Sequence, residues 1–138
     1  MSAEAAWHCE QALLRMFRCL DRGHIDALLN EFAPDGSWLR HGHLLQGHGG
    51  IRTAMEERSA TLFVRHVVTN LIFDSLDDTQ ASATAQMVAY RFDNGAPVTP
   101  PARITAPFLL MSLTIRFIRA GAWRLSALEM RRDFEFVT

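Results

Sequence analysis

The 138-residue sequence contains no lysine, since all 14 of its basic residues are arginines. It has no basic excess either: the formal net charge is −1, and acids and arginines alternate along the chain. The longest apolar stretch, ITAPFLLMSLTI at 104–115, is shorter than the roughly 18 residues of a membrane span and contains a proline. We therefore expect neither a nucleic-acid partner nor a membrane partner.

Cysteine is scarce, with only Cys9 and Cys19 present. Both lie in a segment with helical periodicity, where ten residues at 1.5 Å rise separate them by roughly 15 Å, beyond the reach of a disulfide. Reduced thiols indicate a cytoplasmic protein. The length and the 49% hydrophobic content are typical of one domain over 1–138 that buries a substantial core.

Helical spacing dominates the first third of the chain. The 3.6-residue spacing of Leu13, Met16 and Leu20 predicts a first helix. This helix should end at Gly23, which supplies a C-terminal break. A short helix in IDALLNEF, ended by APDG at 33–36, should come next. SWLRHGHLLQG is typical of a strand with a tight return, and GGIRTAMEERSA of a third helix.

From residue 64 onwards the pattern changes to strands. Four segments are long and rich in β-branched or aromatic residues: VRHVVTNLIFDSL, TQASATAQMVAYRF, ITAPFLLMSLTIRFI and WRLSALEMRRDFEFV. The proline-rich segment NGAPVTPPAR at 94–103 should be a loop over one end of the sheet. Helices followed by a long antiparallel meander indicate an α+β fold.

Five short motifs occur in a fixed order along the chain: DRGH at 21–24, FAPDGSW at 32–38, GHGGI at 47–51, HVVTN at 66–70 and GAW at 121–123. In these motifs the sequence resembles the SnoaL-like branch of the nuclear transport factor 2-like superfamily. The resemblance implies a cone-shaped fold in which a curved antiparallel sheet wraps around the N-terminal helices and leaves an apolar pocket. It also implies a homodimer through the convex face, and the apolar residues on both faces of the strands from 79 to 136 favour one.

The resemblance further implies which residues would carry a reaction. Ketosteroid isomerase-like members use an aspartate and a tyrosine at positions that correspond to Arg40 and Met16, which argues against that mechanism. Scytalone dehydratase-like and dehydrochlorinase-like members pair an aspartate at the end of the first helix with a histidine on the strand after the third. Those positions match Asp21 and His66.

His66 is the leading candidate for a catalytic base. Strand periodicity places it on one face with Val64, Val68 and Asn70, and a histidine among valines needs partners for its ring nitrogens. Asp21 could orient the imidazole and leave its other nitrogen free to take a proton. Alternatively, His66 only ties helix to sheet, and Asp21 caps local backbone.

The candidates for substrate contact are polar or bulky side chains of the predicted strands: Trp38, Arg40, Asn70, Tyr90, Phe108, Met111, Ser112 and Arg116. The amide and hydroxyl groups could bind a ligand or a developing oxyanion. Tyr90 and Ser112 stand near the positions of a histidine and an asparagine in scytalone dehydratase-like members. The arginines could bind an acidic substituent and the apolar side chains could form walls. Each can equally be a structural or solvated residue.

Three histidines, His41, His43 and His48, lie in RHGHLLQGHGG at 40–50. Strand periodicity directs the first two away from Arg40 and from the pocket. A zinc site needs a third protein ligand and a supporting shell, and no cysteine or acidic cluster completes the set. We expect a strand, a turn and a helix start here, without metal.

Two functions remain open on the sequence alone. The first is a cofactor-independent lyase or isomerase that removes a proton from a small, largely apolar substrate, such as a cyclic one, with His66 as base and Asp21 orienting it. The second is a non-catalytic module that binds a small ligand or forms a dimer. A buried Asp21–His66 contact that opens onto a pocket favours the enzyme, and a sealed pair favours the module.

Overall fold

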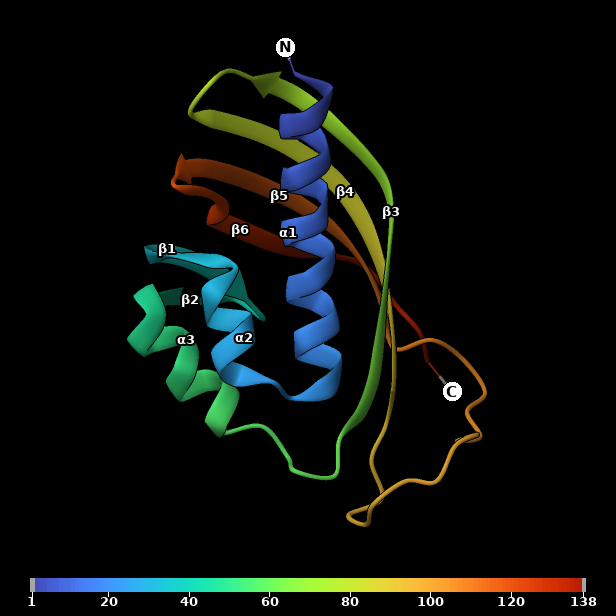
Figure 1. The fold of residues 1–138 in the computed structure, drawn as a ribbon. Helices are drawn as coiled ribbons and strands as arrows, with labels where there is room; N and C mark the ends of the chain where they lie inside the picture. Colours follow the sequence, from blue (N-terminus) through green and yellow to red (C-terminus); the bar gives the residue numbers. More distant parts are fainter. Residues whose placement is uncertain (1, 138) are drawn as a thin grey trace.

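The computed structural model describes residues 2–137, which form helices on the concave side of a curved sheet (Figure 1). In chain order the elements are α1 (Ala3–Arg22), α2 (Ile25–Asn30), β1 (Phe32–Arg40), β2 (His43–Gln46), α3 (Gly47–Glu56), β3 (Phe63–Leu76), β4 (Gln80–Phe92), β5 (Leu109–Ala120) and β6 (Ala122–Glu135). Helices come first and the long strands follow, which confirms the α+β prediction.

The sheet has the strand order β2-β1-β6-β5-β4-β3. It bends around α1, while α2 and α3 lie beside β1 and β2 (Figure 1). The prediction of a purely antiparallel sheet is wrong for one pair, because β1 and β6 are parallel. These two strands are far apart in the sequence, so no hairpin fixes their relative direction.

Two element boundaries differ from the prediction. The segment at 33–36 does not end a helix but belongs to β1, because Phe32 and Ala33 are buried and the N–H of Leu125 donates to the carbonyl of Glu31 at 2.8 Å. Residues 104–108 lie outside β5, so the proline-rich loop spans 93–108 and is longer than predicted. Its last residue, Phe108, donates its N–H to the carbonyl of Ala89 at 2.7 Å.

The ends of α1 follow from local chemistry. Ser2 accepts the N–H of Ala5 at 3.2 Å and caps the start. Gly23, at φ +71°, ends the helix as predicted, in the left-handed conformation that glycine adopts without strain. The buried face of α1 carries Cys9, Met16 and other apolar side chains, and both cysteines are free. Within residues 2–137, no helix combines the length and apolarity needed to cross a membrane.

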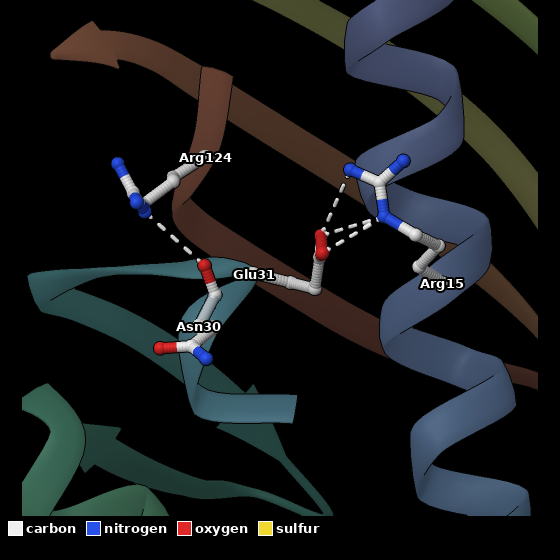
Figure 2. A network of polar contacts seen from close by, with 4 residues as sticks. All are labelled: Arg15, Asn30, Glu31 and Arg124. Atoms are coloured by element: carbon white, nitrogen blue, oxygen red, sulfur yellow. Dashed lines mark hydrogen bonds and ion pairs between the residues drawn. The ribbon is translucent and has the colours of Figure 1, made fainter. Parts of the chain in front are cut away.

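Two polar contacts fix the junction between α2 and β1 (Figure 2). Nε of Arg15, on α1, donates to Oε1 of Glu31 at 2.9 Å, and Nε of Arg124, on β6, donates to the carbonyl of Asn30 at 3.1 Å. The start of β1 is thereby held between α1 and β6. This placement directs the far end of β1, with Arg40, towards the end of α1 where the candidate site lies.

Candidate active site

An aspartate and a histidine from distant parts of the chain meet at the end of α1. Nδ1 of His66 lies 2.5 Å from Oδ1 of Asp21, and the backbone N–H of His66 donates to Oδ2 at 3.2 Å. An ionised carboxylate only accepts hydrogen bonds, so this geometry places the ring proton on Nδ1. Within residues 2–137, Nε2 has no hydrogen-bond partner, so it is the nitrogen that can exchange a proton with a ligand.

The fold holds this pair in place on several sides. Asp21 is in the last turn of α1, and His66 faces α1 from β3 in the same row as Val64 and Val68. The imidazole packs against Phe17, with ring centroids 5.3 Å apart. The two polar side chains are only 9% and 12% exposed, so the contact is nearly withdrawn from water.

The pair is not sealed, because His66 borders two hollows. One is a small inner cavity of about 40 Å³ on the concave side of the sheet, which has room for a few water molecules. The other is a groove of about 240 Å³ between α1 and β3 that Asp21 also lines. The apolar lining of the inner cavity includes Leu20, Leu62, Val64, Phe108, Met111 and Met130.

Three arginines complete the lining of the inner cavity: Arg40 from β1, Arg58 after α3, and Arg91 from β4. Burial first, and then the positive charges of Arg58 and Arg91, lower the pKa of Arg40 to about 10. Burial lowers the pKa of Arg58 as well; the negative charge of Asp21 opposes this shift, and the positive charge of Arg91 adds to it. The wall of the pocket is therefore apolar on one side, as predicted, and lined by arginines on the other.

An outer cavity of about 380 Å³ shares Arg40, His41 and Arg58 with the inner one. Its lining also includes His43 and Glu57. A hollow of this size lies in the range of small-molecule sites.

A larger hollow, of about 620 Å³, lies at the other end of α1. Acids and bases such as Glu4, Asp77, Arg15 and Arg119 line it together, so its charge is mixed. We place the candidate site at His66 instead, because among the described residues this is where a nearly buried histidine–aspartate pair borders a cavity.

Of the predicted contact residues, Arg40, Phe108 and Met111 line the inner cavity with His66. Trp38 does not: it is fully buried, stacks on Phe32 with centroids 5.7 Å apart, and lies 5.6 Å below the guanidinium of Arg40. Trp38 is a core residue that supports Arg40.

Asn70 departs from the predicted strand alternation. Its φ is +56°, and the pairing of β3 with β4 shifts register at this point. The extra residue of such a bulge turns its side chain away from the expected face. Nδ2 of Asn70 instead donates to Oε1 of Gln86 at 2.5 Å, on the outer face of the sheet.

Tyr90, Ser112 and Arg116 also lie on the outer face. Tyr90 alternates with the buried Ala89, and Ser112 with the buried Met111. Ser112 donates to Asp133 of β6. The structure therefore does not bring these predicted contact residues to the cavity.

The prediction that His41 faces away from the pocket is wrong. It has φ +51° in the turn after β1, so strand alternation does not apply to it, and it lines both cavities. Its Nδ1 accepts from Arg132 at 2.9 Å. Burial, and then the charges of Arg40 and Arg132, lower its pKa to about 4. His48 lies elsewhere, with Nε2 2.9 Å from the carbonyl of Phe32.

Metal ligands do not converge around these histidines. In the part of the chain that the structure describes, no group of three His, Cys, Asp or Glu residues is placed to hold a metal ion.

Arg58 and Arg91 are site residues that the sequence reasoning missed. Arg58 ends a charged run, MEER, that resembles a solvated helix face. Arg91 could have been found, because it continues the alternating row of β4 that includes Met87 and Ala89.

Comparison with known proteins agrees with this architecture. Residues 1–129 match the SnoaL-like domain. An NTF2-like protein with a cystatin-like fold from Novosphingobium aromaticivorans is 16% identical, with coverage of 92% of this chain and 80% of that chain and a TM-score of 0.74. A candidate scytalone dehydratase from the same organism is 15% identical, with coverage of 94% and 85% and a TM-score of 0.76.

A Catenulispora acidiphila protein in complex with S-DNPA is 19% identical, with coverage of 96% of each chain and a TM-score of 0.76. At such identities the likeness shows the fold alone, which is the NTF2-like, cystatin-like fold. No curated protein matches the chain.

Proposed function

The chain belongs to the SnoaL-like domain family, and we propose that it is a cofactor-independent lyase or isomerase that removes a proton from a small substrate. The observation that carries the proposal is the Asp21–His66 contact, nearly buried yet bordering a cavity. A carboxylate on one ring nitrogen and an unpartnered second nitrogen are the arrangement of an oriented general base.

In the proposed reaction, Nε2 of His66 takes a proton from a C–H group of the substrate. The electron pair of that bond stays on the substrate, where it forms a double bond and expels a leaving group, or shifts to give an isomer. Asp21 stabilises the imidazolium through Nδ1–H. Because His66 holds the proton, this chemistry needs no cofactor. The nearby arginines would stabilise negative charge that develops on the substrate.

A second candidate is a non-catalytic ligand-binding module. The observation that favours it is the inner cavity of about 40 Å³, which leaves little space for a substrate beside His66. In that case the pair only ties α1 to β3, and a ligand occupies the outer cavity of about 380 Å³.

Turnover by the His66→Gln and Asp21→Asn variants separates the two functions. The wild type is first screened in D₂O by proton NMR against small ketones, alcohols and halides, for loss of substrate and for exchange of C–H protons. On any substrate found, we expect both variants to lose roughly 10²–10⁴-fold in turnover, with effects that are not additive. His8→Gln is the matched control, since His8 is an exposed residue at the other end of α1.

Retained turnover in His66→Gln contradicts the proposed mechanism. A wild type that binds a ligand in the outer cavity but neither consumes nor exchanges protons with any compound supports the module.

We also propose that the protein is a homodimer through the outer face of the sheet. Four large apolar or aromatic side chains are exposed there: Val67 at 47%, Ile72 at 62%, Tyr90 at 39% and Phe134 at 63%. Exposed apolar patches of this kind are typical of protein–protein contacts. Sedimentation at micromolar concentration should give twice the 15.6 kDa chain mass, and Ile72→Arg should halve it. A wild type that sediments only as the single chain contradicts the dimer.

A further inference from the structure

The three arginines of the inner cavity are positive charges without carboxylate partners. Within residues 2–137, none of Arg40, Arg58 and Arg91 takes part in an ion pair. The nearby carboxylates do not form ion pairs with these arginines: Asp21 contacts His66, although its charge still raises the pKa of Arg58, and Glu57 lines only the outer cavity. Three positive charges around one cavity outweigh that single negative charge and repel one another, so the fold maintains this cluster at a cost.

The guanidinium groups are also positioned without using up their N–H donors. Arg40 lies 5.6 Å from the ring centre of Trp38, and Arg91 lies 4.6 Å from the ring centre of Phe108. Stacking on an aromatic face fixes the plane of a guanidinium and leaves its edge free to donate. Neither guanidinium donates a hydrogen bond to any described residue.

Arg58 carries the clearest unfilled donor. Its Nη1 donates to the carbonyl of Leu20 at 3.0 Å, at the end of α1. Its Nε is buried and has no hydrogen-bond partner among the described residues. A buried donor without an acceptor is unfavourable, and a rotation of the guanidinium that turns this N–H towards the cavity would let an anionic ligand supply the acceptor.

We propose that Arg40, Arg58 and Arg91 together bind the carboxylate of a small organic acid. A guanidinium matches the two coplanar oxygens of a carboxylate, and several guanidiniums can share them. The inner cavity of about 40 Å³ suits a group of that size better than a tetrahedral phosphate. The rest of the ligand fits the outer cavity of about 380 Å³, which Arg40 and Arg58 also line.

This inference deepens the proposed function by naming the substrate class, and it depends on that function only for the chemistry at His66. His66 lines the same inner cavity as the arginines, so the C–H group that loses its proton would lie close to the carboxylate. The electron pair left on the substrate would then develop next to three positive charges.

Matched acids and amides test the carboxylate site directly. Benzoate and benzamide have the same shape but differ in charge, as do acetate and acetamide. Calorimetric titration should show benzoate binding to the wild type roughly 10-fold tighter than benzamide, and sodium chloride should weaken the benzoate binding alone. In ¹H–¹⁵N spectra, the Nε–H signal of Arg58 should shift saturably with either carboxylate and stay unmoved by the amides.

Variants identify which arginines bind. Arg91→Gln and Arg40→Gln should each weaken benzoate roughly 10-fold without changing benzamide, and neither side chain bonds to the backbone. Arg116→Gln is the control, because Arg116 has the same charge but lies on the outer face of the sheet. It should bind benzoate like the wild type.

The outcomes distinguish this inference from the proposed function. Benzamide binding as tightly as benzoate, or unchanged benzoate binding in both arginine variants, overturns the carboxylate site. Phenyl phosphate binding tighter than benzoate overturns the choice of carboxylate. His66→Gln should still bind benzoate. If it also retains turnover, the proposed function fails while the anion site stands.

Discussion

Replacing Asp21 by alanine should cost more stability than other single changes at the site, because two donors of His66 depend on this carboxylate. Oδ1 accepts the ring Nδ1–H at 2.5 Å, and Oδ2 accepts the backbone N–H at 3.2 Å. The side chains are 12% and 9% exposed, so water cannot replace both bonds. A hydrogen bond to a charged group contributes about 1.5–3 kcal/mol, and a buried donor left unpaired costs a similar amount. We expect a loss of about 2–4 kcal/mol in the free energy of unfolding.

Asp21→Asn should cost less and yet impair the base more selectively. The asparagine oxygen can still accept the backbone N–H, which leaves its NH₂ group facing Nδ1 of His66. The ring must then accept at Nδ1 and carry its proton on Nε2, so it can no longer take a proton from a substrate. We expect a loss of about 1–2 kcal/mol, which for a chain of 138 residues lowers Tm by roughly 3–10 °C.

Urea unfolding of the wild type, Asp21→Asn, His66→Gln and the double variant measures the contact as a double-mutant cycle. The coupling energy should be about 1–2 kcal/mol, since the residues touch. Asp26→Asn is the matched control, because its ion pair with Arg52 is at the surface and should add almost nothing to stability. A coupling energy below about 0.5 kcal/mol for Asp21 and His66 would refute the reasoning.

Three further predictions concern the surroundings of the site. Gly36→Ala should lower the unfolding free energy by about 1–3 kcal/mol, because a Cβ there would lie 3.0 Å from two backbone carbonyl oxygens. Gly49→Ala should raise it by about 0.5–1 kcal/mol, because Gly49 is a helical residue of α3 and a Cβ there would meet no other atom. Urea titrations that rank the two glycine variants the other way contradict the packing. Asn70→Ala should lower the free energy of unfolding by about 1–2 kcal/mol, because alanine is strained at the φ of +56° that this position adopts. Asn70→Gly should lower it less, since glycine tolerates that conformation. Equal urea midpoints for the two variants would contradict this prediction. The pKa of His41 is lowered to about 4 in the folded protein. Between about pH 6.5 and 4, His41 is therefore protonated in the unfolded chain but not in the folded one, so the stability of the fold decreases as the pH falls through this range. His41→Gln should lessen that fall, and an NMR titration midpoint of His41 above pH 6 would contradict the prediction.

Periodicity and turn residues predicted most of the fold, but not the parts whose structure depends on contacts between distant segments of the chain. The end of α1 at Gly23 and the long strands follow from periodicity and turn residues, which act within a few positions. The segment at 33–36 contains proline and glycine and was predicted to end a helix, yet it belongs to β1. The residues on either side of it, Phe32 and Ser37, pair with β6 about 90 residues later and hold the segment in the strand, and no local pattern contains this information.

The site shows the same division more sharply. The Asp21–His66 contact was predicted from motif positions in a family with a known layout, and the structure has the two side chains 2.5 Å apart. The predicted orientations of Asn70 and His41 are wrong because both assumed unbroken alternation along a strand. Each has a positive φ, which reverses the direction of the side chain and cannot be read from residue type alone.

Whether the basic side chains that line the cavity stay protonated depends on their being arginines rather than lysines. Burial and two like charges lower the pKa of Arg40 to about 10, which still leaves it protonated at neutral pH. A lysine starts from about 10.4, so the same burial and repulsion would bring it close to losing its proton under those conditions. The arginine side chain can also stack on Trp38 and still line the cavity, which keeps its N–H donors free for a ligand. The proposed anion site therefore depends on arginine at the buried end of β1, because a lysine there would not keep its charge.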